Sequence, residues 1–393
     1  MAFSFARTPD IRFGSKTSCE LPEVVARYGT RILLITGGES LSKSGRLWYF
    51  NQTLTDHGMN VSIFSVAGEP SPNIVDEAVS KYYSEGIQVV VAIGGGSVLD
   101  AGKAISAMLP TGESVVDYLE GIGTKSHNGI KIPFVAIPTT SGTGSECTKN
   151  AVISRVGPGG FKKSLRHDNF VPDVALVDPE LMLGCPKHIT AACAMDAFSQ
   201  LFESFVSTQA HAMTDALAYS GLQQMVKNML PAYDHGSTDL QARIGIAYGA
   251  MQSGITLANV GLCVTHGFAS SIGGMYTIPH GVICARILPA AVEITIRQLK
   301  RSKLESPEAE EMLYKHAIVA QLITGNNSAD IDLVNEQMVQ KIYDWVNYMQ
   351  IPALGEFGIT EANFENIASV TSCKNNPVHL NNSHLCEILA KSL

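Results

Sequence analysis

The sequence predicts two domains of different class, an α/β domain with a parallel sheet over residues 1–180 and an all-α domain over residues 181–393. Short β-branched apolar runs alternate with amphipathic segments only in the first half. Glycine-rich turns follow several of these runs, and after Pro179 the chain becomes rich in Ala, Leu and Met at helical spacing. A chain of 393 residues is also longer than one hydrophobic core ordinarily supports.

The apolar runs of the first half are typical of buried parallel strands. Each is short, rich in β-branched residues and bounded by Gly, Pro or Asp-Pro. The segment 73–85 between two of them carries apolar residues at a spacing near 3.6, which predicts a helix. Strand–helix alternation of this kind predicts a parallel sheet with helices on its faces. The predicted strands are residues 31–36, 61–66, 88–93, 134–137 and 174–177.

The second half has long segments of helical spacing in which Gly and Pro are sparse. These are residues 191–206, 212–229, 240–260 and 306–324. We place the domain boundary near 178–186, where the texture of the sequence changes. We find neither a repeat of 20–50 residues nor a low-complexity linker.

Composition excludes several classes of partner. The net charge is −8 and Lys and Arg form no long run, so we expect binding to neither nucleic acid nor an anionic membrane. The longest apolar runs are far shorter than the roughly 20 residues of a membrane span, and the N-terminus does not resemble a signal peptide. The 8 cysteines form no CxxC pair and are expected to be reduced thiols. We therefore expect a cytoplasmic enzyme.

The sharpest local signal is the turn Gly94, Gly95, Gly96, which follows the strand at 88–93 and precedes helix-forming residues. We expect Ser97 to cap that helix, with Asp100 in the capping-box position. Backbone N–H groups and a helix N-terminus aimed at one point favour a phosphate. The turn has neither the P-loop nor the GxGxxG pattern, so a strand–helix turn without a ligand remains the alternative.

Two further turns follow predicted strands. One spans 138–146, and the other follows the strand at 31–36. If these strands are neighbours, the turns meet at one sheet edge, where nucleotides bind in open α/β sheets. The residues expected there are Gly37, Gly38, Ser40, Thr139, Thr140 and Thr143.

The helical half contains a candidate metal constellation. Asp196 lies in an apolar helix, where a carboxylate is costly unless it is paired or bound to a cation. Gln200 is one turn further along the same face. His266 and His280 are each followed by glycine in apolar stretches. One carboxylate and two imidazoles can hold a divalent transition metal, although each histidine alone is more often a core residue.

Together these segments resemble the iron-containing (group III) alcohol dehydrogenase family. The resemblance implies a dinucleotide-binding α/β domain and a helical domain, the two-domain architecture of dehydroquinate synthase, with the active site in the cleft between the domains. It extends in the family's order and spacing from about residue 30 to 290. The segments that carry it are 94–103, 138–146, 195–197, His266 and 278–281.

The resemblance implies a metal held by four side chains. Asp196, His266 and His280 carry over directly and are the implied catalytic residues, whereas Gln200 stands where the family usually has a histidine as the fourth ligand. Ser270 stands where the family often has a histidine near the nicotinamide. A Gln oxygen is a weaker, neutral ligand, so Fe²⁺ retention should fall. Iron and zinc therefore both stay open, as does a metal-free reductase of the same family.

The implied reaction is hydride transfer between a nicotinamide and an alcohol, aldehyde or ketone, with the metal polarising the oxygen. We expect Gly95, Gly96 and Ser97 to bind the pyrophosphate and the three threonines to line the nicotinamide side. Lys162 lies where the family often has a cofactor-contacting lysine, although Lys163 is adjacent. The Gly37–Gly38–Ser40 turn resembles that of NADP-using members, so we predict NADP(H) over NAD(H). Lys43 favours this preference and Glu39 opposes it.

Two other functions remain open at this stage. One is a cyclising lyase of the dehydroquinate synthase type, which regenerates its cofactor. The other is a nucleotide-binding protein without catalytic activity. For the dehydrogenase we expect a small alcohol or carbonyl substrate and a homodimer or higher homo-oligomer.

Overall fold

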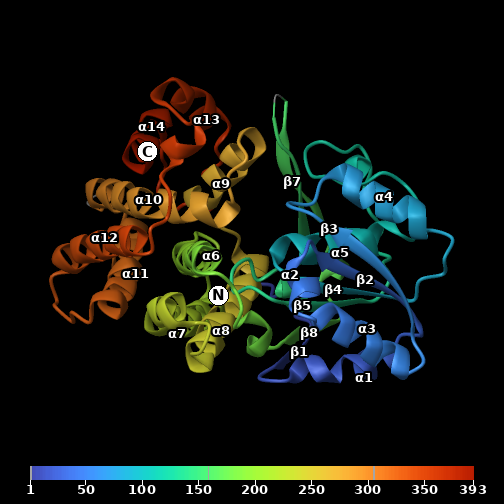
Figure 1. The fold of residues 1–393 in the computed structure, drawn as a ribbon. Coiled ribbons are helices and arrows are strands. Elements are labelled where there is room, and N and C mark those ends of the chain that lie inside the picture. The colour runs from blue at the N-terminus through green and yellow to red at the C-terminus, as the bar shows by residue number, and fades with distance from the viewer. Residues whose placement is uncertain (1, 158, 304–305) are drawn as a thin grey trace. The chain divides into compact units, whose positions relative to one another are not determined.

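The computed structural model describes residues 2–157, 159–303 and 306–393, and the chain divides into two compact units. One unit comprises residues 5–155 and 162–185. The other comprises residues 186–393 together with the short segments 2–4 and 156–161, within the described ranges. The first unit is α/β and the second is helical (Figure 1), which confirms the predicted fold class.

The first unit contains a six-stranded sheet in the order β1-β8-β5-β4-β2-β3. Every recorded strand pair in it is parallel, as predicted. The runs predicted from the sequence form five of these strands. The edge strand β1 was not predicted, because its sequence Asp-Ile-Arg-Phe carries two charges and is only partly buried. The strands are β1 (Asp10–Phe13), β2 (Arg31–Gly37), β3 (Asn60–Val66), β4 (Val89–Gly94), β5 (Phe134–Pro138) and β8 (Val174–Val177).

The order of the strands creates a switch point beside β2. The chain passes from β2 to β3 on one side and then returns to place β4 on the other side. In open parallel sheets, ligands bind outside the carboxyl ends of the strands at such a point. The topology therefore indicates a ligand-binding site at the carboxyl ends of β2 and β4, where Gly37 and Gly94 lie.

Helices cover both faces of the sheet. Leu21 and Val24 of α1 and Phe50 of α3 pack on one face with alternate strand residues such as Val91. The predicted helix 73–85 is α4, and Ser71 Oγ caps it by accepting from the N–H of Ile74. The helices of this unit are α1 (Leu21–Ala26), α2 (Ser40–Lys43), α3 (Arg46–Asp56), α4 (Pro72–Tyr82) and α5 (Gly96–Met108).

A separate two-stranded sheet, β6 (Asn150–Arg155) and β7 (Phe161–Arg166), was not predicted from the sequence. Polar residues occupy much of both strands, so neither resembles a buried parallel strand. Strand β7 carries Lys162 and Lys163. Of these two side chains, Lys162 is buried and Lys163 is exposed.

The helical unit is built around α6, which is buried almost throughout from Thr190 to Val206. Helices α7, α8 and α10 pack against it. Such a helix must be apolar on all sides, so each polar residue within it needs a partner. The helices are α6 (Lys187–Val206), α7 (Ala212–His235), α8 (Leu240–Val260), α9 (Val264–Met275), α10 (His280–Ser302), α11 (Pro307–Thr324), α12 (Ile331–Tyr348), α13 (Phe364–Val370) and α14 (Asn382–Ser392).

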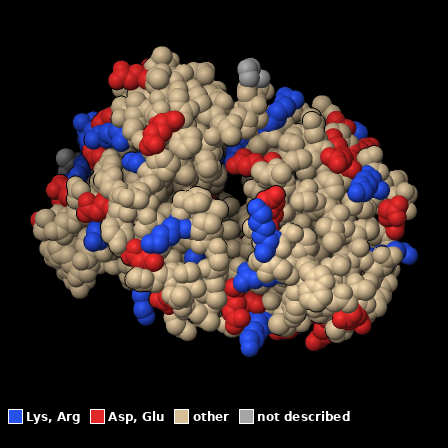
Figure 2. All heavy atoms as spheres, viewed as in Figure 1, with Lys and Arg blue, Asp and Glu red and all other residues tan. Residues whose placement is uncertain are grey.

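Surface charge and the apolar composition of the helices are the features that bear on binding to a membrane. Basic and acidic side chains are interspersed over the face shown in Figure 2. Among the described residues, no single helix has the length and apolar composition to cross a membrane; α8 and α9, bent by 95° at their junction, meet that test only as a pair.

Candidate active site

The three glycine-rich turns lie together at the carboxyl edge of the sheet. Strand β4 pairs with both β2 and β5, so the turn after β5 lies beside the turn after β4, as expected. A Cβ placed on Gly96 would lie 2.5 Å from the Oγ1 of Thr143, and one on Gly95 would lie 3.3 Å from the Oγ1 of Thr140. A Cβ on Gly37 would lie 3.3 Å from Val98 at the start of α5. The glycines therefore let three turns pack closely around one point.

The predicted capping of α5 by Ser97 is wrong. The helix begins at Gly96, its N-cap residue is Gly95, and Ser97 is already helical. The cap depends on the backbone at Gly95, which the residue pattern does not reveal. Because Gly95 has no side chain, the first turn of α5 stays open to an anion.

Asp100 and Lys103 hold α5 against the chain after β5. The carboxylate of Asp100 accepts from the Ser145 hydroxyl and from the N–H of Val152. The buried Nζ of Lys103 donates to the carbonyl oxygens of Ser145 and Asn150, both at 2.8 Å. Burial lowers the pKa of Lys103 to about 8. Sequence analysis assigned no role to Lys103, although a lysine in so apolar a helix was a usable signal.

Lys162 is held by an ion pair. Its Nζ lies 2.7 Å and 2.8 Å from the carboxylate oxygens of Glu69. Glu69 also accepts from the Ser154 hydroxyl at 2.9 Å. The position of the Lys162 ammonium is thus fixed, and its contact with a cofactor stays a prediction.

The turn after β2 is open. A Cβ placed on Gly38 would meet no described heavy atom within 4 Å. Helix α2 begins at Ser40, and Lys43 within it pairs with Glu39. Both side chains are well exposed, at 74% for Lys43 and 77% for Glu39. The lysine expected to favour a 2′-phosphate and the glutamate expected to oppose it are therefore partners.

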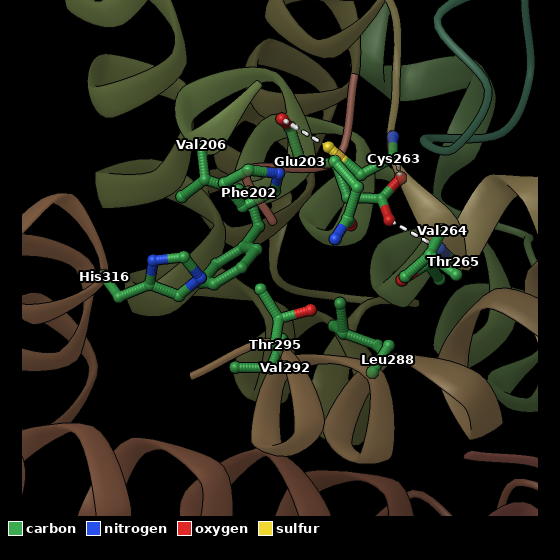
Figure 3. A pocket seen from close by; sticks show the side chains of 13 residues that line it. Phe202, Glu203, Val206, Cys263, Val264, Thr265, Leu288, Val292, Thr295 and His316 are labelled. Carbon is green, nitrogen blue, oxygen red and sulfur yellow. Dashed lines mark hydrogen bonds between the residues drawn. The ribbon is translucent and has the colours of Figure 1, made fainter. Parts of the chain in front are cut away.

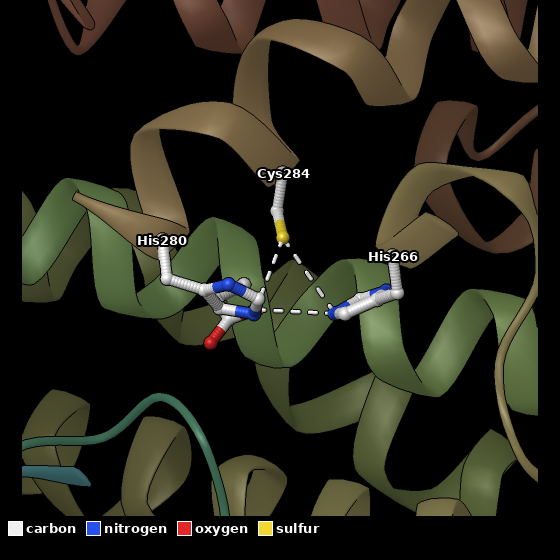
Figure 4. A group of neighbouring side chains, drawn as sticks. His266, His280 and Cys284 are labelled. Carbon is white, nitrogen blue, oxygen red and sulfur yellow. Dashed lines mark hydrogen bonds and ion pairs between the residues drawn. The ribbon is translucent and has the colours of Figure 1, made fainter. Parts of the chain in front are cut away.

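In the helical unit, Asp196, His266 and His280 come together from α6, α9 and α10. The Oδ1 of Asp196 lies 3.3 Å from the Nε2 of His266 and 3.6 Å from the Nε2 of His280. A fourth side chain, Cys284, lies against the two histidines (Figure 4). The ligand atoms of the four residues lie within 4.8 Å of one another. Sequence analysis missed Cys284, although it lies one helical turn after His280.

Two glycines explain how the histidines reach this point. A Cβ on Gly281 would lie 2.3 Å from the carbonyl oxygen of Ala192 on α6. A Cβ on Gly267 would lie 2.0 Å from the carbonyl oxygen of Ser372. Each helix is therefore packed against backbone directly after its histidine, which fixes where that histidine lies.

Glu203 is a second residue that sequence analysis missed. Its carboxylate accepts from His266 Nδ1 at 2.8 Å and from the N–H groups of Thr265 at 2.7 Å and Cys263 at 3.0 Å. Carboxylates bonded to the far nitrogen of a histidine orient that ring towards a metal. The usable signal was its position seven residues after Asp196, on the same face of α6.

Burial and the neighbouring charges shift the pKa values of the clustered side chains. Burial alone would raise the pKa of Asp196, but the nearby His280 and His266 stabilise the carboxylate more strongly. The pKa of Asp196 therefore lies below its usual range. Burial alone would lower the pKa of His266. Its interactions with Cys284, Asp196 and Glu203 have a larger, opposite effect, so the pKa of His266 is raised well above its usual value. Burial raises the pKa of the Cys284 thiol to about 11. Asp196 is 2% exposed and His280 27%, so the cluster is most accessible at His280.

Gln200 and Ser270 occupy the two positions where the chain departs from the family pattern. Gln200 is buried one turn after Asp196, and its Oε1 accepts from the Ser253 hydroxyl at 2.7 Å. Ser270 is exposed on α9, one turn after His266. Whether Gln200 binds a metal stays a prediction.

Glu203 also borders a small pocket together with Phe202, Thr295 and His316 (Figure 3). His316 is fully buried, and its Nδ1 donates to the Met312 carbonyl at 2.7 Å. Burial lowers the pKa of His316 to about 4, which keeps the ring neutral. Most of the lining is apolar, so the pocket belongs to the core rather than to a polar binding site.

Comparison with known proteins gives matches over the whole chain. A family model described as iron-containing alcohol dehydrogenase matches residues 8–179, and a model of that family's C-terminal region matches residues 190–393. The chain is 31% identical to long-chain-alcohol dehydrogenase 1 of Geobacillus thermodenitrificans over 351 residues, 88% of this chain and 84% of that protein. It is also 31% identical to 1,3-propanediol dehydrogenase of Klebsiella pneumoniae, over 87% and 85% of the two chains.

A solved structure agrees with this result. The crystal structure of an archaeal halo-thermophilic alcohol dehydrogenase from a Red Sea brine pool matches with a TM-score of 0.89 and 26% identity. The match covers 100% of both chains, so it includes both units.

Proposed function

Since the chain belongs to the iron-containing alcohol dehydrogenase family, we propose a specific division of labour for its alcohol dehydrogenase activity. The α/β unit binds the nicotinamide cofactor, and the cluster in the helical unit engages the oxygen of an alcohol, aldehyde or ketone. The observation that carries this is the convergence of Asp196, His266 and His280 from three helices onto one point. The reaction is hydride transfer between the nicotinamide and the carbon that bears the oxygen.

The cofactor binds at the carboxyl edge of the sheet. Gly94, Gly95 and Gly96, with Ser97, leave the start of α5 open to the pyrophosphate. Asp100 and Lys103 keep the neighbouring turn in place, where Thr139, Thr140 and Thr143 line the nicotinamide side. Lys162, held by Glu69, is proposed as a further cofactor contact.

The residues of the cluster fit a divalent transition metal, iron or zinc. Two imidazoles and a carboxylate are ligands of both, and Glu203 supplies the outer partner of His266. When bound, the metal supplies a Lewis acid that polarises the substrate oxygen. Asp196 brings negative charge, Glu203 fixes the tautomer of His266, and His280 forms the more accessible side. Gln200 remains the fourth ligand that the sequence predicts, and a different fourth ligand is argued below.

We propose a preference for NADP(H) over NAD(H). The turn after β2 has glycines where an acidic residue would bind the ribose of NAD. Space at Gly38 leaves room for a 2′-phosphate, and Lys43 offers a nearby positive charge. Its pairing with Glu39 makes the preference modest.

We further propose a cytoplasmic location and a homodimer or higher homo-oligomer. The 8 cysteines are all free thiols, which suits a reducing compartment. On α3, Trp48 is 69% exposed and Tyr49 45%, which offers aromatic surface to a second copy. Light scattering of the purified protein measures the assembly directly.

The activity is tested with metal-depleted and metal-reloaded protein on a panel of alcohols, aldehydes and ketones with both cofactors. We expect net oxidation or reduction of the cofactor in proportion to substrate, restored by Fe²⁺ or Zn²⁺. Full activity without metal would favour a metal-free reductase. Product formation without net change in the cofactor would favour a cyclising lyase, and binding without turnover would favour a nucleotide-binding protein.

A further inference from the structure

We propose that Cys284 is the fourth ligand of the metal, so that this chain holds its ion with one carboxylate, two imidazoles and one thiolate. The proposal rests on the metal site of the proposed function and deepens it. Its basis is the position of the Cys284 Sγ, 3.6 Å from the Nε2 of His266 and 3.7 Å from the Nε2 of His280.

The distances from Cys284 and from Asp196 to the two histidines agree with those in a tetrahedral site. Metal bonds of about 2.3 Å to sulfur and about 2.0–2.2 Å to nitrogen and oxygen place sulfur roughly 3.6 Å, and a carboxylate oxygen roughly 3.4 Å, from nitrogen in a tetrahedron. The two sulfur–nitrogen distances, 3.6 Å and 3.7 Å, agree with the first value. The two oxygen–nitrogen distances, 3.3 Å and 3.6 Å, agree with the second.

The side chains are also directed towards one point. Cys284 follows His280 by one turn of α10, so both project from the same face of that helix. The Nε2 of His266 faces them, because Glu203 holds the Nδ1 on the other side of the ring. Figure 4 shows the sulfur and the two rings turned towards a common centre.

The chemical surroundings of Cys284 differ from those of a packing cysteine. A buried thiol that serves only the core behaves as a small apolar group and lies among other apolar groups. Cys284 is fully buried but lies against two imidazoles, in a cluster that also contains the carboxylate of Asp196. A thiolate there would give the site a second negative charge, which with Asp196 balances a divalent cation.

Cys284 thereby supplies the charged fourth ligand that Gln200 cannot provide. The amide of Gln200 is neutral and brings no charge to balance a cation, and its oxygen accepts from the Ser253 hydroxyl at 2.7 Å. A thiolate is a softer ligand than the histidine usual at position 200 and suits Zn²⁺, which also stands above Fe²⁺ in the general order of divalent metal affinities. The inference is therefore a site that prefers Zn²⁺ to Fe²⁺.

The test is cobalt substitution of the chelator-treated full-length protein. Co²⁺ bound to a thiolate gives a sulfur-to-cobalt charge-transfer band in the near ultraviolet, which nitrogen and oxygen ligands do not give. We expect this band at one Co²⁺ per chain. Cys284→Ser should lose it and bind Zn²⁺ at least tenfold more weakly. Cys147→Ser, a buried cysteine of the other unit, and Gln200→Ala should keep it.

The outcomes separate this inference from the proposed function. Stoichiometric Co²⁺ binding without the band, or a band that survives in Cys284→Ser, would overturn the role of Cys284 and leave the metal site standing. Absence of any Co²⁺ or Zn²⁺ binding would overturn both. If Cys284→Ser does not fold, X-ray absorption of the wild-type zinc protein decides instead. We expect one sulfur at about 2.3 Å from zinc, and a shell of nitrogen and oxygen alone would refute the inference.

Discussion

The Nδ1 of His266 donates to the carboxylate of Glu203 at 2.8 Å, and this bond fixes which nitrogen of the ring faces Asp196. Because a carboxylate only accepts, a proton must lie on Nδ1, so Nε2 is the nitrogen of this ring that can bind a metal. The same carboxylate accepts from two N–H groups at the start of α9. One side chain of α6 therefore sets both the position of α9 and the tautomer of its histidine.

Replacing Glu203 by Gln should weaken metal binding by about 10–100-fold, since outer-shell partners of metal-bound histidines contribute on this scale. The amide keeps the volume and can still accept from the backbone, so the melting temperature should change less than the metal affinity. Competition titration with a zinc chelator measures the effect. The exposed Glu361→Gln serves as the control, and equal affinity in both variants would show that Glu203 is only structural.

Gly95→Ala should weaken cofactor binding at least tenfold, or about 1.4 kcal/mol, because its methyl occupies the space of the pyrophosphate. The Cβ would lie 3.3 Å from Thr140, so the fold should accept it with a small shift. Gly184→Ala is the control, because a Cβ there meets no described atom within 4 Å. Fluorescence titration with the reduced cofactor gives both affinities. Unchanged affinity in a folded Gly95→Ala protein would remove this turn from the site.

Gly38→Asp should shift the ratio of kcat/KM values from NADP(H) towards NAD(H). The new carboxylate would accept from the ribose 2′-OH and repel a 2′-phosphate, and the open space at Gly38 accommodates it. Steady-state kinetics with both cofactors measures the ratio. A wild-type protein that favours NADH tenfold or more would contradict the proposed preference and make Glu39 the ribose partner.

His316 should make the folded protein sensitive to acid. Its folded-state pKa of about 4 lies below the usual value of about 6.5, so the unfolded chain takes up the proton first. The free energy of unfolding should therefore fall as the pH drops from about 6.5 towards 4, by up to about 3 kcal/mol. His316→Asn in metal-free protein should flatten this slope, whereas the exposed His57→Asn should not. Parallel slopes for wild type and His316→Asn in urea unfolding would refute the prediction.

The local elements of the α/β unit were predictable because their signals are local. The runs at 31–36 and 88–93 are apolar and end in glycine, so each strand and the turn that follows it are visible in a few residues. Strand β1 and the β6–β7 pair lack that signal, because they are polar and only partly buried. The cap of α5 was misassigned because it depends on the backbone of Gly95 rather than on residue type.

The candidate metal cluster was predictable only in part. Asp196, His266 and His280 stood out as polar residues in apolar helices, and the family resemblance grouped them. Cys284 and Glu203 did not stand out, because a cysteine and a glutamate have many ordinary roles and because Glu203 contacts a helix that is distant in sequence. Glu203 and His266 are 63 positions apart in the sequence, so no local sequence pattern indicates their contact.

The most direct test of the central claim is the transfer of deuterium to the cofactor from a primary alcohol in which both hydrogens on C1 are replaced by deuterium. With metal-loaded protein, we expect one deuterium in the reduced nicotinamide, detected by mass spectrometry, and an equal amount of aldehyde. Asp196→Ala should bind the cofactor normally but lose the metal and slow this transfer by orders of magnitude. Reduced cofactor without deuterium, or a wild-type rate in Asp196→Ala protein that holds no metal, would contradict metal-assisted hydride transfer at this cluster.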